Sequence, residues 1–395
     1  MKDKFISKRF WKSETTPMGE VDELAKQFAD VINLSIGDPD LATDWRITEP
    51  AFEDAKAGHT KYTDFRGDPE LRKEIRNCYR EDFHLDIRDE EIFVAAGGCL
   101  AMYLVLEAIL DEKDEVIIQA PYFTPYKQQV ELAGGIPVAL DTAMEEQFQI
   151  HAEQLEGLVT VRTKAIIINT PNNPTGTCLT GKSLETVAAF AKKYDLLVIA
   201  DDIYGAFSYE APFIPMLSME GMKKRTITIN SFSKNYIMTG WRVGNIIAPA
   251  NIIKTIQHIN ENVMFTAPSV SQRAAIYALR QRKELQPPVV EAYRKRVCYA
   301  AERANRIPGM SVLAPKATFY LFVNIEQTGL SSRQVSDVIL EEAHVVTIPG
   351  IAFGDCGEGF IRIACTVNLD LLQEAFDRIE QVFIFQPYRS STLLR

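Results

Sequence analysis

One segment of the chain combines residue types that could hold a covalently bound, phosphorylated cofactor. Residues 231–244 read S-F-S-K-N-Y-I-M-T-G-W-R-V-G and follow the apolar run 226–230. The amine of Lys234 could form a Schiff base with an aldehyde. The hydroxyl of Ser231 and the planar guanidinium of Arg242 could bind a phosphate. Most lysines are ordinary surface residues, so this interpretation depends on the rest of the chain.

Four more apolar runs, each a predicted strand, are followed by groups that suit the same ligand; they are residues 92–96, 116–118, 165–168 and 196–200. Gly98 follows the first run and opens a predicted helix, so its amide could bind an anion. Phe123 follows the second run, and a flat ring could stack on it. Asn173, in N-N-P-T-G, follows the third run, and the acid Asp201 follows the fourth. Each of these four features also has an ordinary structural explanation: in the same order, a tight turn, core packing, an Asx-turn and a helix cap. Because ligands of open α/β sheets bind at the carboxyl ends of strands, their convergence indicates one site.

Short apolar runs alternate with helical patterns along residues 48–285, and these predicted strands and helices must position the groups named above. This alternation predicts an α/β fold with a largely parallel sheet. One helix is predicted to begin at Asp68-Pro69, with Leu71, Ile75 and Tyr79 on its buried face. The pattern loosens after 285, so we expect a large domain over 48–285 and a small one built from 1–47 and 286–395.

Composition narrows the functional classes. The chain has 395 residues, with 43 basic and 53 acidic side chains and a net charge of −10, which argues against a nucleic-acid partner. No apolar run reaches membrane-spanning length, and none follows the basic first twelve residues as in a secretory signal. Six scattered cysteines and five isolated histidines predict neither disulfides nor a metal site. We expect a cytoplasmic protein.

The motifs S-x-S-K-x-x-x-x-x-G-W-R-x-G and N-N-P-T-G, in this order, resemble those of the class I/II aminotransferases, pyridoxal 5'-phosphate (PLP) enzymes of fold type I. The resemblance runs from the turn at Gly37 to R-I-A at Arg362. It implies a large, mainly parallel seven-stranded sheet domain flanked by helices and a smaller α+β domain. It also implies that Lys234 forms the internal aldimine and carries the catalytic proton. Asp201, three residues before Tyr204, would pair with the ring nitrogen, in preference to Asp202.

The resemblance assigns further roles by position. Tyr204 would assist catalysis at the ring oxygen, and Tyr62 would reach the phosphate of a neighbouring subunit, which implies a homodimer. The implied cofactor-binding residues are Gly98, Cys99, Phe123, Asn173, Asp201, Tyr204, Ser231, Lys234, Arg242 and Tyr62. The implied ligands of the substrate are Arg362, for its α-carboxylate, with Gly37 and Asn173. Two segments depart from the family pattern: Cys99-Leu100 in the phosphate cup and 317–320 on the substrate side.

The expected reaction is the transfer of an amino group from an L-amino acid to a 2-oxo acid by a ping-pong mechanism. The alternative is a C–S β-lyase on the same fold, but lyases of this kind tend to have histidine at Tyr204 and N-P-V-G in place of N-P-T-G. A regulator with a DNA-binding module is disfavoured because the fold begins almost at residue 1. The sequence does not identify the donor or acceptor. Arg9, Lys12 and Arg46 are candidate cations for a distal carboxylate, and no role is predicted for the polar tail after Gln386.

Overall fold

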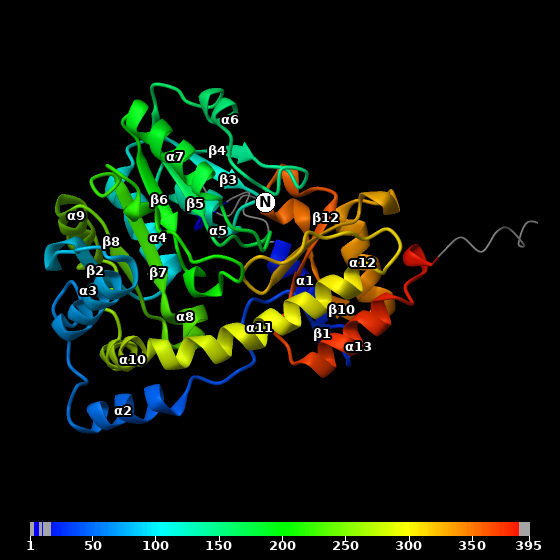
Figure 1. Cartoon of the computed structure of the whole chain (residues 1–395), viewed down its shortest axis with the longest axis horizontal. Helices are drawn as coiled ribbons and strands as arrows, with labels where there is room; N and C mark the ends of the chain where they lie inside the picture. The colour runs from blue at the N-terminus through cyan, green and yellow to red at the C-terminus, as the bar shows by residue number, and fades with distance from the viewer. Residues whose placement is uncertain (1–3, 8–9, 11–16, 387–395) are drawn as a thin grey trace, which may run out of the picture.

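A seven-stranded sheet forms the centre of the structure, a computed structural model that describes residues 4–7, 10 and 17–386 (Figure 1). Arg9, Lys12 and the tail beyond Gln386 lie outside the described residues. In spatial order the strands are β2 (Ile92–Ala95), β8 (Gly244–Ile247), β7 (Thr226–Ser231), β6 (Leu197–Asp201), β5 (Thr163–Asn169), β3 (Glu115–Ala120) and β4 (Ile136–Asp141).

Strand direction fixes where the ends of these strands lie. β8 is antiparallel to both of its neighbours, β2 and β7, whereas β7, β6, β5, β3 and β4 pair in parallel. β2 therefore runs in the same direction as β7, and every strand except β8 ends at one edge of the sheet. The predicted α/β class with a mainly parallel sheet is confirmed.

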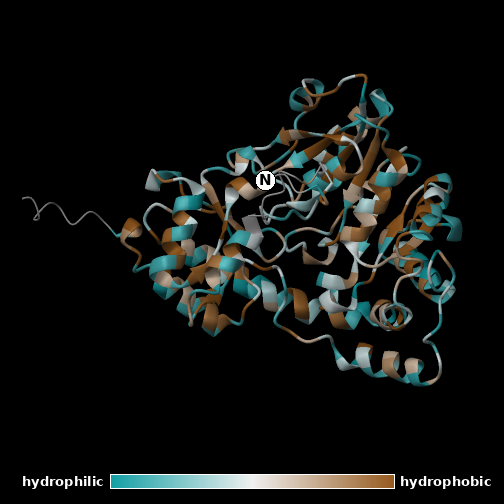
Figure 2. Ribbon diagram, turned by 180° about the vertical axis from the view of Figure 1, so that it is seen from behind, coloured by the Kyte–Doolittle hydropathy of each residue, from teal (hydrophilic) through white to brown (hydrophobic). Residues whose placement is uncertain are grey.

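Helices cover both faces of the sheet because the strands are apolar on both sides. In β5, Ala165 and Ile167 pack in one cluster, while Ile166 and Ile168 pack in another on the opposite face. The ribbon seen from behind shows this apolar interior as brown strands between helices of mixed polarity (Figure 2). One face is covered by α4 (Gly98–Ile109), α5 (Pro125–Leu132) and α9 (Ala250–Asn260). The other is covered by α3 (Pro69–Phe83), α7 (Gly181–Lys193) and α10 (Ser269–Arg280), and α2 (Trp45–Lys56) packs on α10.

The helix predicted from Asp68-Pro69 is α3. The Asp68 side chain accepts a hydrogen bond from the Glu70 amide, which satisfies a free donor of the first turn. Leu71, Ile75 and Tyr79 are buried in the core, as predicted.

The C-terminal part has a core of its own, built around the antiparallel strands β11 (Ile348–Pro349), β12 (Phe360–Ala364) and β9 (Tyr320–Asn324). β1 (Ile32–Asn33) pairs with β10 (Val345–Val346), so the N-terminal segment joins this part. The helices here are α1 (Pro17–Ala25), α12 (Ser332–Ala343) and α13 (Leu369–Ile379). The long helix α11 (Arg282–Ala304) runs between the two parts (Figure 1), with Leu285 in one core and Val297 in the other.

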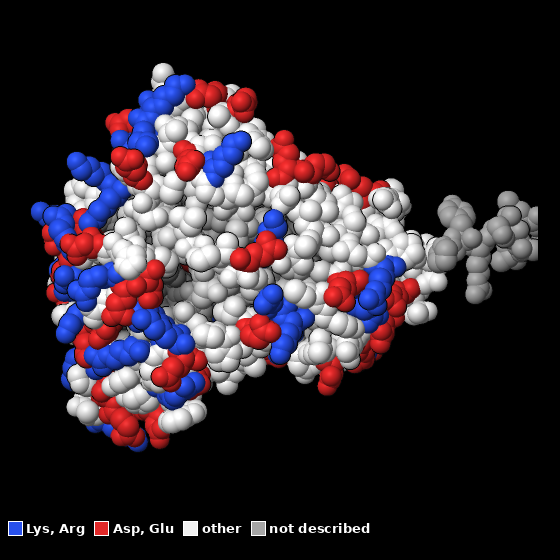
Figure 3. Space-filling view, viewed as in Figure 1, with Lys and Arg blue, Asp and Glu red and all other residues white. Residues whose placement is uncertain are grey.

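Charged side chains of both signs are interspersed along the side of the large domain where α2, α3, α9 and α10 lie, whereas the surface over the strands is mostly uncharged in this view (Figure 3). Ion pairs join α10 to its neighbours, such as the buried Arg273 with Asp54 and the exposed Arg280 with Glu74. Among the described residues, no helix is long and apolar enough to cross a membrane, and no group of three or more metal-binding side chains is found.

Candidate active site

A cavity of about 140 Å³ lies at the edge of the sheet where the parallel strands end. It gathers residues that follow β2, β3, β5, β6 and β7. Nine of the ten residues predicted to bind the cofactor line it: Gly98, Cys99, Phe123, Asn173, Asp201, Tyr204, Ser231, Lys234 and Arg242. The strand ends thus meet at one place, as the sequence predicts.

One wall of the cavity is suited to an anion. Gly97 precedes α4 with φ of +90°, and a Cβ there would stand 2.6 Å from Nη2 of Arg242, so the cation lies against bare backbone. On the other side, Ser231 caps the short helix α8 (Phe232–Asn235), and its Oγ accepts a hydrogen bond from the Ser233 amide. Helix amides, hydroxyls and a guanidinium in one cup are typical of phosphate binding.

The acid at the end of β6 is buried, since Asp201 is only 4% exposed. Burial raises its pKa to about 6, although hydrogen bonds from the hydroxyl of Tyr126 and the amide of Ile203 oppose the shift. Phe123, which packs edge-to-face on Tyr126 at 5.6 Å between ring centroids, lines the same cavity. A carboxylate in this position would be stabilised by a positively charged ring nitrogen beside it.

The next residue points to the other side of the sheet, because side chains alternate along a strand. Asp202 is 1% exposed, does not line the cavity, and neither of its carboxylate oxygens has a hydrogen-bond partner in the described structure. Burial, followed by the nearby charge of Asp201, raises the pKa of Asp202 well above its usual value. Of these two neighbouring acids, Asp201 alone faces the cavity.

Lys234 reaches into the cavity from α8 and donates a hydrogen bond to the backbone oxygen of Gly37 over 2.5 Å. Burial lowers its pKa to about 8, and the positive charges of Arg362 and Arg242 act in the same direction, while Asp38 opposes them. A larger share of neutral amine is therefore present near neutral pH than for a lysine in water, and the neutral amine is the nucleophilic and basic form.

Arg362 lies behind the cavity wall on β12 and is 1% exposed. It donates to Oδ1 of Asn173 over 3.0 Å and to the backbone oxygen of Ser35, and its guanidinium stacks on the rings of Tyr320 and Phe353. Its Nε has no partner among the described residues. Burial lowers the pKa of Arg362, and no carboxylate among the described residues forms an ion pair with it. The guanidinium is therefore suited to binding an anionic group.

A hydrogen-bond chain ties this arginine to the buried acid. The backbone N–H of Asn173 donates to Oδ1 of Asn169 over 2.8 Å, and Nδ2 of Asn169 donates to the backbone oxygen of Asp201 over 2.9 Å. Together with the bond from Arg362 to Asn173, these contacts fix β12, the N-N-P-T-G loop and the end of β6 relative to each other.

Tyr320 packs between Tyr204, Gly37 and Arg362. Its hydroxyl lies 3.0 Å from that of Tyr204, and burial raises the pKa of Tyr204 well above its ordinary value. The same hydroxyl is so close to Gly37 that a Cβ on Gly37 would stand 1.8 Å away. Position 37 therefore requires glycine.

Two predicted positions lie elsewhere in the described chain. Tyr62 is 78% exposed and packs on Phe265 with ring centroids 4.7 Å apart, outside the cavity of its own chain. Arg46 forms two 2.9 Å hydrogen bonds from its guanidinium to Asp44 and does not line the cavity.

Sequence reasoning passed over four other lining residues, Tyr126, Asn169, Ile203 and Ser233. Tyr126 and Asn169 follow or end two of the predicted strands. Their bonds to Asp201 depend on strands 115–120, 163–169 and 197–201 lying side by side in this order, which the sequence alone does not give. The side chain of Ile203 is apolar, so its residue type does not indicate a place in a ligand-binding cavity.

The fold places the chain among the fold-type I transferases. An aromatic aminotransferase from Pyrococcus horikoshii, solved by crystallography, superposes with a TM-score of 0.87 at 37% identity, covering 92% of this chain and 98% of the other. The chain belongs to the aminotransferase class I and II family, whose model matches residues 29–379.

Relatives in the family support an aminotransferase rather than the lyase alternative. An aspartate aminotransferase of Pyrococcus horikoshii is 37% identical over 380 residues, covering 95% of this chain and 97% of the relative. Aromatic-amino-acid aminotransferase 2 of Thermococcus litoralis is 37% identical over 364 residues, covering 91% and 93%.

We expect Asp202→Asn to remove a pH-dependent loss of stability. Because the folded-state pKa of Asp202 is raised, only the unfolded chain releases its proton as the pH rises above 3.8, so this acid destabilises the fold by about 1.4 kcal/mol per pH unit until its folded-state pKa is reached. The asparagine variant should gain stability relative to the parent across this window. Urea denaturation at a series of pH values measures it, and parallel curves for the two proteins would contradict the prediction.

We expect Gly37→Ala to destabilise the protein by about 1–3 kcal/mol and to raise KM, because the new methyl group would overlap the Tyr320 hydroxyl. Adding Tyr320→Phe should restore part of the loss by removing that oxygen. Gly240→Ala is the matched control, since a Cβ there meets no atom within 4 Å. Equal urea midpoints for Gly37→Ala and Gly240→Ala would show that position 37 has room for a side chain.

Proposed function

We propose that this chain transfers the amino group of an L-amino acid to a 2-oxo acid with PLP held in the 140 Å³ cavity. The observation that carries the proposal is the meeting, at one edge of the sheet, of the Lys234 amine, the buried Asp201 carboxyl and the anion cup at Arg242. Family membership supports it, since the named relatives are aminotransferases.

The residues present fit the cofactor. The amides at the start of α4, the hydroxyl of Ser231 and the guanidinium of Arg242 would hold its phosphate, Phe123 would stack on its ring, and Asp201 would take the ring nitrogen. When bound, PLP supplies an aldehyde for a lysine and a ring that withdraws the electron pair of a bond at the substrate Cα.

The chain's own residues would do the rest of the work. The guanidinium of Arg362 binds the substrate α-carboxylate, and its hydrogen bond to Asn173 sets its direction. Orientation of the substrate in this way brings its Cα–H bond to the Lys234 amine. The amine, with its pKa lowered to about 8, takes the Cα proton and later returns a proton as a general acid.

The proposal includes a homodimer. Tyr62 and Phe65 pack on Phe265, and Val263 and Met264 beside it are also exposed, with exposed fractions of 78% for Tyr62 and 52% for Val263. An exposed apolar patch of this kind is typical of an interface. A second copy seated there would bury the patch and let Tyr62 reach the phosphate end of the neighbouring cavity.

Lys234→Ala should abolish the visible absorption of lysine-bound PLP and lower turnover by about 10²- to 10⁴-fold or more, because it removes the covalent anchor and the proton carrier together. Lys254→Ala, an exposed lysine on α9, is the matched control and should keep both properties. The assay follows 2-oxo acid formation from a panel of amino acids that includes aspartate and tyrosine. Parent-like turnover in Lys234→Ala would refute the mechanism, and ammonia released from cysteine without an oxo acid would favour the lyase.

Tyr62→Phe should weaken PLP binding by about tenfold, the cost of one hydrogen bond to a charged group, and leave the oligomeric mass unchanged. Phe265→Asp, which places a charge in the apolar patch, should give monomers that also lose PLP readily. Light scattering gives the mass, and equilibrium dialysis gives the PLP dissociation constant. A monomeric parent protein, or parent-like PLP affinity in Tyr62→Phe, would contradict the proposed role.

A further inference from the structure

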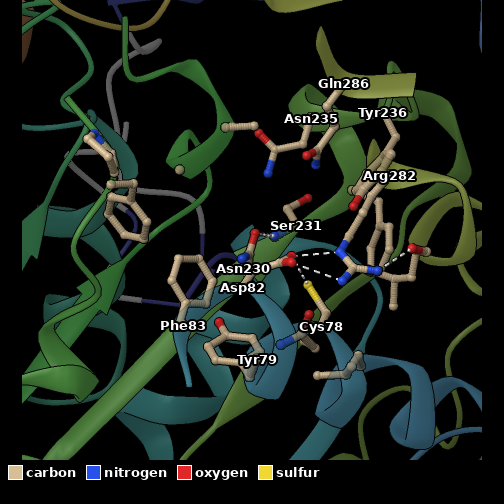
Figure 4. A pocket seen from close by; sticks show the side chains of 18 residues that line it. Cys78, Tyr79, Asp82, Phe83, Asn230, Ser231, Asn235, Tyr236, Arg282 and Gln286 are labelled. Atoms are coloured by element: carbon tan, nitrogen blue, oxygen red, sulfur yellow. Dashed lines mark hydrogen bonds and ion pairs between the residues drawn. The ribbon is translucent and has the colours of Figure 1, made fainter. Parts of the chain in front are cut away.

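A second cavity, of about 290 Å³, lies beneath the active-site segments (Figure 4). It is bounded by α3, by the neighbouring strands β7 and β8, by α8 and by the start of α11. Ser231 lines both cavities, so the two are separated by the segment that begins α8. The proposed transamination uses no other residue of this second cavity.

Three carboxamide side chains lie on the floor of the cavity, and two of them have an atom without a hydrogen-bond partner in the described structure. Asn230 and Asn245 lie directly opposite each other on β7 and β8, and Asn235 comes from α8. Asn235 and Asn245 are 6% and 4% exposed, yet Oδ1 of Asn235 and Nδ2 of Asn245 have no hydrogen-bond partner among the described residues. Buried polar groups are nearly always hydrogen-bonded, so an acceptor and a donor on the same floor indicate a missing polar partner.

The walls are apolar and aromatic. Ile75 and Leu279 are buried in the adjoining core, while Phe83 and Phe213 form an edge-to-face pair at 6.0 Å between ring centroids. Water alone could satisfy the floor, but it would leave these aromatic faces wet. Apolar walls with a few converging polar groups are typical of small-molecule sites.

The cavity presents no free charge to a ligand among the described residues that line it. The guanidinium of Arg282 is bound by Asp82 over 2.6 Å and by Glu81 over 2.7 Å, and Figure 4 shows its bonds to Asp82 beside Cys78. A charged ligand would lose its hydration without a counter-ion in return.

We propose that this cavity is a binding site for an uncharged planar molecule that carries a hydrogen-bond donor and an acceptor on one edge, the chemistry of an aromatic carboxamide or a nucleobase. Its polar edge pairs with Asn235 and Asn245, and its ring lies between the aromatic walls. The occupant contacts Asn235, which follows Lys234 in the sequence, and Gly205, which follows Tyr204. Binding here therefore changes the affinity for PLP, and by linkage PLP changes the affinity for the occupant by the same factor.

The test titrates the full-length protein, with and without PLP, with benzamide, nicotinamide, adenine and uracil by isothermal calorimetry. We expect saturable binding of at least one compound with a dissociation constant below about 1 mM, and no binding of benzoate, which has the same ring with a charge. Benzamide or nicotinamide binding identifies the carboxamide class, and adenine or uracil binding identifies the nucleobase class. We also expect the PLP dissociation constant to differ with and without the bound compound.

Two variants locate the site, and neither touches the proposed catalytic residues. Cys78→Phe fills the cavity from α3 and should abolish binding, and Asn245→Leu removes one polar partner and should weaken it by about tenfold or more. Activity without added ligand should stay near that of the parent in both. No saturable binding, binding that survives both variants, or a crystal soaked with the compound that holds only water in the cavity would overturn the proposal. Equal PLP dissociation constants would overturn the coupling.

Discussion

The bond between Arg362 and Asn173 links the two cores of the chain at the candidate active site. Asn173 belongs to a loop of the large sheet, and Arg362 belongs to the C-terminal sheet, so this bond joins the two cores at the site. Backbone bonds from Ala317 to Gly176 and from Tyr122 to Phe353 join the same two parts. Asn169 passes the constraint on to the end of β6, where Asp201 lies. A shift in any one of these segments would move the proposed carboxylate-binding group and the proposed ring-binding acid away from each other.

The ionisable groups of this site are held away from their preferred states in water. Burial raises the pKa of Asp201 to about 6, lowers that of Lys234 to about 8 and lowers that of Arg362. The directions differ, but in each case burial disfavours the charged form. Ligands of opposite charge would relieve this cost, so the arrangement is suited to an anionic and a cationic partner.

The sequence predicted the sheet edge well because apolar runs followed by glycine, asparagine, acid or lysine are local patterns, and parallel strands bring their ends together. Alternation along β6 accounts physically for Asp201 rather than Asp202 facing the cavity. Contacts between segments far apart in the sequence could not be predicted. Examples are the hydrogen bond from the Tyr126 hydroxyl to Asp201 and the close packing of the Tyr320 hydroxyl on Gly37. The sequence also does not predict that Asn235 and Asn245 each have a side-chain atom without a hydrogen-bond partner, because the residues around them come from α3 and α11. The domain boundaries and the residue roles stay predictions.

The antiparallel direction of β8 limits how the connection between β7 and β8 can change in length. Because β7 ends and β8 begins at the same edge, a single short connection, residues 232–243, contains both Lys234 and Arg242. An insertion or deletion there would displace the two anchors at once, whereas the loops with Asn173 and Asp201 can change length separately. The two anchors therefore share one segment that is held at both ends by paired strands, so their separation is fixed more tightly than that between Asn173 and Asp201.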